Sequence, residues 1–163
     1  MAAQGWPEQV ERVAAYLREA GVESRVEEFP ETTPTAADAA RAVGCQLGQI
    51  VKSLVFDCEG NAVVVLVPGD RRADTGKVAA AAGCGSARIA GPEQVEAATG
   101  FEPGAVAPFP LPRVASVFVE RSLLQHRVVW VGAGSTRHLA SLAAPELVRL
   151  TGAETIDAVA EAT

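Results

Sequence analysis

Two largely apolar segments joined by a short polar turn constrain the fold of this chain most. The first covers residues 48–57 and the second residues 62–67, with Glu59-Gly-Asn61 between them. Two short apolar runs joined by a turn that contains glycine predict a β-hairpin. Because residues 63–67 are apolar without alternation, we expect both faces of the second strand to be buried.

Lys52 lies in the middle of the first of these strands. At the period of two that a strand imposes, it shares a face with Ile50, Leu54 and Phe56. A lysine on such a face is costly unless it is paired, neutralised or open to a cavity. One interpretation is that the stem is buried while the ammonium reaches water. The other is a pocket that needs a positive charge for an anionic or strongly polar ligand.

Periodicity and turn residues predict the remaining elements. We expect a helix over residues 10–17 that ends at Gly21, one over 36–43 that Thr35 and Asp38 cap and Gly44 ends, one through 77–82 capped by Asp74 or Thr75, one from Pro92 to Gly100, and one from Pro145. Further strands are expected over residues 25–29, 88–89, 114–119, 127–131, which Gly132-Ala-Gly134 breaks, and 138–142. The expected fold is mixed α/β (α+β), with six or seven strands around one sheet or partial barrel, as a single domain over residues 1–163.

The segment 101–112 is expected to be irregular yet packed. It contains four prolines and one glycine, which exclude regular structure. Its residues Phe101, Val106, Phe109 and Leu111 are too apolar for a solvated linker. We therefore expect this loop to cover another part of the protein.

Composition limits the partners. The 163 residues carry a formal charge of −6, so any contact with nucleic acid should be small and local, and DNA is not an expected partner. No apolar run approaches the roughly 20 residues of a membrane span, and the first residues lack the layout of a signal peptide, which predicts a cytoplasmic protein. Cys45, Cys58 and Cys84 are odd in number and widely spaced, so we interpret them as small buried residues without a disulfide framework or zinc site.

The segment Gly132-Ala-Gly-Ser-Thr-Arg-His138 permits several interpretations. It lacks the lysine and spacing of a phosphate-binding loop, and Ser135 is not in the G-x-S-x-G motif of hydrolases, although a small hydrolase that uses Ser135 stays open. His126 is expected at the surface, whereas His138 either packs or contributes to a site. Two histidines without metal-binding spacing give no set of metal ligands, and no cofactor is expected.

Three segments together resemble the YbaK/prolyl-tRNA synthetase-associated domain family of aminoacyl-tRNA editing enzymes. They are Gln49-Ile-Val-Lys52-Ser-Leu, Thr99-Gly-Phe-Glu-Pro-Gly104-Ala-Val-Ala-Pro108-Phe and Gly132-Ala-Gly134-Ser-Thr-Arg-His138. Their order and spacing agree with the family, and the resemblance covers about residues 32–152.

The resemblance implies a mixed sheet curled into a partial barrel with flanking helices. It also implies a trans-acting deacylase that hydrolyses the ester between a wrong amino acid and the CCA end of a tRNA, most often tRNA for proline. Lys52 would be the required catalytic residue. The substrate-binding residues would be Gly104, Val106, Pro108, Phe109, Gly132, Gly134, Ser135 and His138.

Several points stay open at this stage. The edited amino acid is alanine, cysteine, serine or another small residue, and the protein is a monomer or a homodimer. Arg71 and Arg72 either meet phosphates or form a solvated turn. A module of the same fold that binds an aminoacyl group, a nucleotide or a protein without turnover is the alternative to an enzyme.

Overall fold

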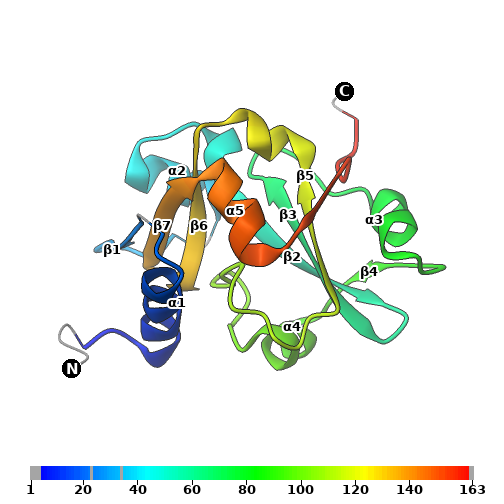
Figure 1. Ribbon diagram of the computed structural model, residues 1–163, viewed down its shortest axis with the longest axis horizontal. Coiled ribbons are helices and arrows are strands. Elements are labelled where there is room, and N and C mark those ends of the chain that lie inside the picture. Colours follow the sequence, from blue (N-terminus) through cyan, green and yellow to red (C-terminus); the bar gives the residue numbers. More distant parts are fainter. Residues whose placement is uncertain (1–4, 23, 34, 162–163) are drawn as a thin grey trace.

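The computed structural model describes residues 5–22, 24–33 and 35–161. Figure 1 shows the arrangement of its helices and strands. The helices are α1 (Glu8–Glu19), α2 (Ala36–Val43), α3 (Thr75–Ala82), α4 (Pro92–Thr99) and α5 (Ala144–Thr151), with 3-10 turns at Leu47–Gln49 and Arg121–Gln125. The strands are β1 (Arg25–Glu28), β2 (Val51–Cys58), β3 (Asn61–Pro68), β4 (Arg88–Ile89), β5 (Ser116–Glu120), β6 (Val128–Ser135), β7 (His138–Ala143) and β8 (Glu154–Ile156).

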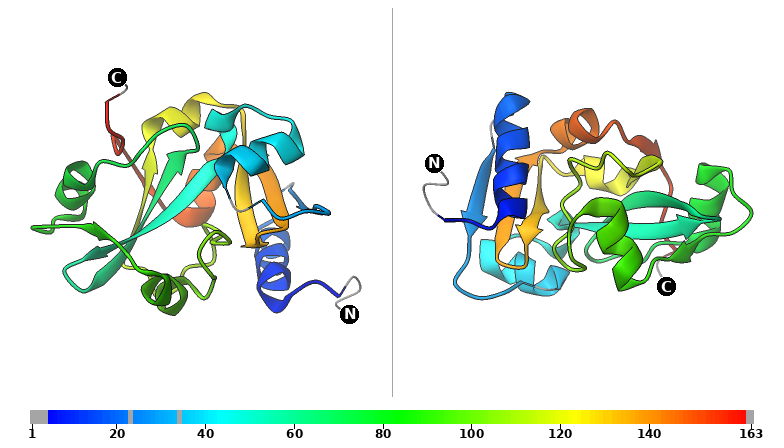
Figure 2. Two further views of the ribbon diagram at one scale, coloured as in Figure 1. Left: turned by 180° about the vertical axis from the view of Figure 1, so that it is seen from behind. Right: turned by 90° about the horizontal axis from the view of Figure 1, so that it is seen from below.

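The strands form two sheets. One has the order β4-β2-β3-β5-β8 and the other the order β1-β7-β6, and an isolated bridge between Ile50 and Trp130 connects them. Figures 1 and 2 show the smaller sheet standing beside the β2–β3 hairpin with α1 against it. The mixed α/β class is confirmed. The prediction of one sheet with six or seven strands is wrong, and the partial barrel is not confirmed because the two sheets do not close.

The predicted hairpin of β2 and β3 is confirmed. Its antiparallel pairing runs from Val51 with Pro68 to Cys58 with Asn61. The two residues of the turn, Glu59 and Gly60, have φ angles of 53° and 96°, and such a turn matches the twist of paired strands. The side chains of residues 63–67 are at most 2% exposed, so both faces of β3 are buried as expected.

The predicted end of the strand at Gly132 is wrong. Strand β6 continues to Ser135, and its pairing with β7 shifts register between Gly132 and Ser135. The glycines lie in a β-bulge, and the pairing of β6 with β7 resumes beyond them. From the sequence alone, a bulge of this kind looks the same as the end of a strand. Strand β8 was not predicted, and it pairs in parallel with β5.

Helix ends follow the predicted chemistry. Thr35 Oγ1 accepts a hydrogen bond from Asp38 N, and Gly44 ends α2 in the left-handed conformation. Asp74, rather than Thr75, caps α3 by accepting from Lys77 N. Within the described residues, no helix has both the length and the apolar character needed to cross a membrane.

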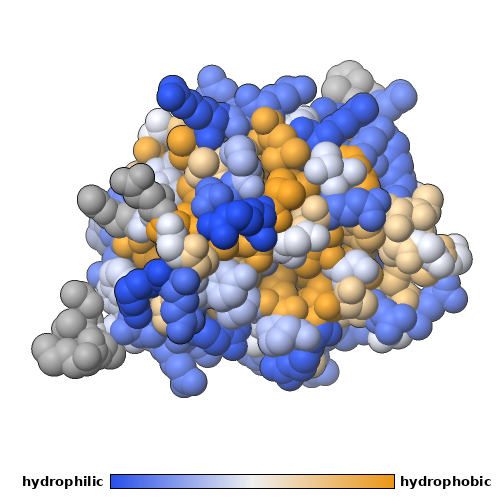
Figure 3. All heavy atoms as spheres, in the orientation of Figure 1, coloured by the Kyte–Doolittle hydropathy of each residue, from blue (hydrophilic) through white to orange (hydrophobic). Residues whose placement is uncertain are grey.

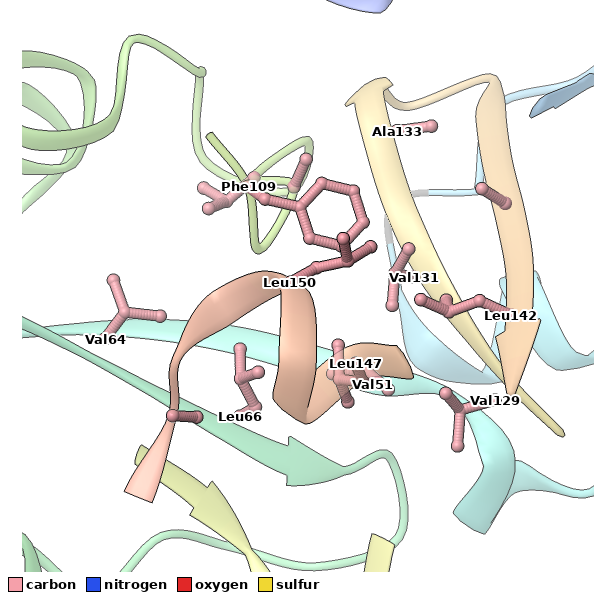
Figure 4. Close-up of a cluster of buried hydrophobic side chains, with 14 of the residues drawn as sticks. Val51, Val64, Leu66, Phe109, Val129, Val131, Ala133, Leu142, Leu147 and Leu150 are labelled. Atoms are coloured by element: carbon pink, nitrogen blue, oxygen red, sulfur yellow. The ribbon is translucent and has the colours of Figure 1, made fainter. Parts of the chain in front are cut away.

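The main core lies between the two sheets, beneath α1 and α5. In Figure 4, Phe109 points from its loop toward β6, and Leu150 of α5 lies beside it. Tyr16 of α1 stacks on Phe109 with ring centroids 5.3 Å apart. Phe101, Ala105, Ala107 and Phe109 are all buried, so the prediction that residues 101–112 pack against the protein is confirmed.

The interpretation of all three cysteines as separate buried thiols is wrong. Cys58 and Cys84 form a disulfide across a sequence separation of 26, and Cys45 is free. The pairing was not expected because the two residues are far apart in sequence. The end of β2 and the segment after α3 nevertheless meet in the fold.

Replacing both Cys58 and Cys84 with alanine should lower the free energy of unfolding by about 3 kcal/mol, since a cross-link of this span restricts the unfolded chain. Urea unfolding of the oxidised protein measures the difference. The control is Cys45→Ala, which leaves the disulfide intact. Equal urea midpoints for the double variant and the oxidised parent would contradict a stabilising disulfide.

Candidate functional site

A cavity of about 490 Å³ lies between α2 and the start of β2. The left view of Figure 2, from behind, shows α2 beside β2 and the smaller sheet. Most of the wall is apolar or glycine, and three hydroxyl groups and one cation interrupt it. The lining residues are Thr33, Thr35, Ala36, Ala37, Ala39, Leu47, Ile50, Val51, Lys52, Ser53, Leu54, Gly69, Gly104, Val106, Gly132 and Leu139.

Lys52 supplies the cation of this cavity. Its Nζ donates a hydrogen bond to the carbonyl oxygen of Arg71 at 2.8 Å. Burial lowers the pKa of Lys52, the nearby Arg72 lowers it further, and Asp70 opposes these effects. An ammonium has three N–H donors, so two remain for a ligand once Arg71 is satisfied. The side chain can therefore hold an anionic or carbonyl oxygen inside the cavity.

Ser53 contributes a second polar group. Its Oγ is buried, and among the described residues it has no hydrogen-bond partner. The hydroxyls of the two lining threonines are used differently, because Thr33 donates to Thr136 O and Thr35 caps α2. A buried hydroxyl without a partner is unfavourable, so a ligand that completes its hydrogen bond would gain affinity.

Close backbone approaches shape the cavity where the proline-rich loop meets β6. A Cβ atom on Gly132 would lie 2.9 Å from the carbonyl oxygen of Val106, so only glycine lets the loop come this near. Gly104 has a φ of 84°, a conformation that strains other residues. Gly104, Val106 and Gly132 are thus brought together with Lys52.

The other predicted substrate-binding residues do not line this cavity. Pro108 and Phe109 are buried in the loop, with Phe109 in the main core. Gly134 lies against the backbone of Gln9 in α1. Ser135 and His138 contact each other. Because His138 is adjacent in β7 to the lining residue Leu139, the side chains of His138 and Leu139 point to opposite faces of the strand.

His138 is only 3% exposed and lies in a distinct cluster. Its Nδ1 is hydrogen-bonded to Ser135 Oγ, and its ring forms a T-shaped contact with the ring of Trp6. Its Nε2 lies 3.3 Å from Glu28 Oε2, without the alignment of a hydrogen bond. Burial lowers the pKa of His138, Glu28 raises it and Arg137 lowers it, with burial the largest effect. At neutral pH the imidazole is therefore uncharged.

The remaining predicted polar residues are near the cavity but outside it. Arg71 donates from its guanidinium to Ala160 O, whereas Arg72 is exposed. His126 is half-buried. A Cβ atom added at Gly48 would lie 3.4 Å from His126 Nε2 and 3.3 Å from a carboxylate oxygen of Asp70, so both side chains border Gly48. Within the described part of the chain, no group of three or more histidine, cysteine or acidic side chains could hold a metal ion.

Sequence reasoning missed the wall that α2 provides. Thr33, Ala36, Ala37, Ala39 and Leu139 line the cavity but were not predicted as site residues. The run of alanines in α2 was the available signal, since small side chains let a helix approach its neighbours closely.

A second hollow, of about 430 Å³, contains none of the predicted site residues. Residues of β2, α4 and the segment before β5 line it. Figure 3 shows apolar atoms reaching the surface between α5 and α4, while much of the rest of this face is hydrophilic. The cavity that contains Lys52 is therefore the candidate site.

Comparison with known proteins shows which family this chain resembles as a whole. A solved structure provisionally described as a trans-editing enzyme for prolyl tRNA synthetase superposes with a TM-score of 0.89 at 37% identity, covering 96% of this chain and 100% of that one. YwhH of Bacillus subtilis, an uncharacterized protein, is 35% identical over 126 residues, which are 77% of this chain and 80% of YwhH.

A third relative carries an activity in its name. It is EbsC of Enterococcus faecalis, provisionally named a Cys-tRNA(Pro)/Cys-tRNA(Cys) deacylase, which is 27% identical over 121 residues, 74% of either chain. Residues 30–150 match the model of the aminoacyl-tRNA editing domain. The chain therefore belongs to the aminoacyl-tRNA editing domain family, whose YbaK-type members its three sequence segments resemble.

Proposed function

We propose that this chain, as one domain over residues 1–163, is a trans-acting deacylase that removes a small wrong amino acid from the CCA end of a tRNA. Proline tRNA carrying alanine or cysteine is the best candidate substrate, in keeping with the names of its relatives. The observation that carries the proposal is the half-buried Lys52, which lines a largely apolar cavity and donates one hydrogen bond from its Nζ, to Arg71 O.

The proposed reaction is a hydrolysis. Water oxygen attacks the ester carbon, the bond to the ribose oxygen breaks, and the proton from water goes to that oxygen, giving a free amino acid and an intact tRNA. Lys52 would hold the ester carbonyl as negative charge develops on it. An aminoacyl ester is intrinsically labile, so orientation and charge stabilisation suffice without a protein nucleophile.

The cavity also provides a basis for selection. A Cβ atom added to Gly132 would lie 2.9 Å from the carbonyl oxygen of Val106, so the loop and β6 pack closely at this wall, and we expect the wall to limit the size of the aminoacyl side chain. Exclusion by size is the principle of a second editing sieve. Small aminoacyl groups should enter, and the larger correct amino acid should not.

A panel of proline tRNAs charged with alanine, cysteine, serine or proline tests the function. Release of a small amino acid at a rate above spontaneous hydrolysis, with prolyl-tRNA left intact, is the expected result. No acceleration of any ester would reject the deacylase. Saturable binding without turnover would favour the second candidate, a binding module, which the apolar cavity around Lys52 also suits.

Ser53→Ala should lower kcat/KM for the preferred ester by about tenfold, because a hydrogen bond to the substrate is lost. The same change should leave the free energy of unfolding within about 1 kcal/mol of the parent, since the hydroxyl has no partner to lose. Paired kinetics and urea unfolding measure both quantities. Ser141→Ala, on β7 and outside the cavity, is the matched control. Unchanged kinetics in Ser53→Ala would show that this hydroxyl does not meet the substrate.

A further inference from the structure

The turn between β6 and β7 connects the His138 cluster to the wall of the cavity. Thr33 lines the cavity, and both its backbone N–H and its Oγ1 donate to the carbonyl oxygen of Thr136 in this turn, the latter at 3.0 Å. Thr33 is 8% exposed and lies just before Thr35, which caps α2. The position of this wall therefore depends on the position of the turn.

The strand before Thr33 is fixed to the same turn. Phe29 N donates to Arg137 O at 2.8 Å, and Arg137 Nε donates to Phe29 O at 2.9 Å. Glu28 pairs with His138 in the β1–β7 ladder, so their side chains lie on one face. A change around His138 is thus transmitted to residues 28–33 through several direct bonds.

The hydrogen bonds around His138 define its proton. Ser135 Oγ accepts from Arg137 N at 3.0 Å, so its own hydrogen is available to donate to His138 Nδ1. The neutral imidazole then carries its proton on Nε2, which faces the carboxylate of Glu28. Protonation of Nδ1 would make it the donor to Ser135 Oγ. The Ser135 hydroxyl would then have to rotate inside the turn of residues 135–138.

We propose that Glu28 and His138 act as positioning residues that set the cavity wall at Thr33, so that substrate binding depends on the protonation of His138. The proposal rests on the deacylase function for its kinetic readout. Glu28 lies outside residues 30–150, which match the family model, so the family comparison does not assign it a role. It touches neither the cavity nor the substrate and acts through His138 and the turn.

The charges that face His138 fix the direction of the pH effect. The carboxylate of Glu28 favours the imidazolium and raises the pKa of His138, whereas burial and Arg137 lower it. Removing the charge of Glu28 must therefore lower this pKa further. The acid limb of the pH profile, the range in which kcat/KM falls as the pH is lowered, should then move to lower pH.

Glu28→Gln tests this direction while it keeps the size of the side chain. In the parent, KM should rise as the pH falls through the titration of His138, while kcat for the preferred ester stays constant within about twofold. In Glu28→Gln the rise should occur at lower pH. At a pH where the parent has begun to lose activity to acid, the variant should keep more of its neutral-pH kcat/KM than the parent.

Glu27→Gln is the matched control, because it removes the same charge from the adjacent residue of β1, whose ladder partner is Leu139 rather than His138. It should titrate like the parent. An acid limb in Glu28→Gln that coincides with the parent, or moves to higher pH, would overturn the proposal. A uniform loss of activity with an unmoved limb would do the same, since a merely structural Glu28 predicts it.

An NMR titration separates this proposal from the deacylase function. The ring signal of His138, assigned with a His126→Gln variant, and the amide signals of Thr33 and Thr136 should shift with one midpoint, and this midpoint should be lower in Glu28→Gln. A Thr33 amide that does not follow His138 would reject the coupling. If His138 and Thr33 titrate together but the protein hydrolyses no ester, the proposed deacylase function is rejected while the coupling between His138 and Thr33 stands.

Discussion

Lys52→Ala should reduce kcat/KM for deacylation by at least about tenfold, a loss of about 1.4 kcal/mol in transition-state stabilisation. The reason is that, among the described residues that line the cavity, Lys52 is the one cation. Its remaining N–H donors are the strongest groups on that wall for an ester oxygen that gains negative charge. The fold should survive, because the hydrogen bond to Arg71 O contributes only about 1 kcal/mol.

Steady-state kinetics with a mischarged tRNA measure this effect, and Lys52→Met separates charge from packing. Methionine keeps much of the apolar stem but lacks the positive charge. If the charge is what matters, Lys52→Met should lose as much activity as Lys52→Ala. Lys77→Met is the matched control, since Lys77 pairs with Asp157 and contacts Val159 O, away from the cavity. A folded Lys52→Ala protein with unchanged deacylation would remove Lys52 from the mechanism.

The sequence was most informative where local chemistry decides the structure. The β2–β3 hairpin was predictable because two apolar runs flank a polar turn, and Lys52 could be singled out because a cation interrupts one of them. The proline-rich loop was predictable as packed because its side chains need cover. The same loop supplies Gly104 and Val106 to the cavity, beside Lys52.

The features that depend on contacts distant in sequence were not predictable in the same way. Neither the Cys58–Cys84 pair nor the α2 wall has a local signature, because each forms only when separated segments meet. His138 illustrates a different limit. The resemblance to the editing family made it a candidate site residue. Whether its side chain meets the cavity depends on the register of β7 after a bulge, where a shift of one residue exchanges the two faces.

Phe109→Ala should lower the free energy of unfolding by about 3–5 kcal/mol, the cost of removing a fully buried aromatic ring. Phe109 is 1% exposed, stacks on Tyr16 and belongs to the core shared by α1, α5 and β6. Although the loop that carries it reaches the cavity through Gly104 and Val106, Phe109 itself does not line that cavity. We therefore expect its contribution to be stability rather than direct contact with the aminoacyl group.

Urea unfolding and the relative kcat/KM for alanyl, cysteinyl and seryl esters distinguish these roles. Phe109→Leu fills more of the space and should fold even where alanine does not, with selectivity among the three esters within about twofold of the parent. Leu111→Ala, at a half-buried position of the same loop, should cost clearly less stability than Phe109→Ala. If Phe109→Leu changed selectivity several-fold with little loss of stability, the ring would act on the substrate. The core contacts of Phe109 would then be secondary to its role in recognition.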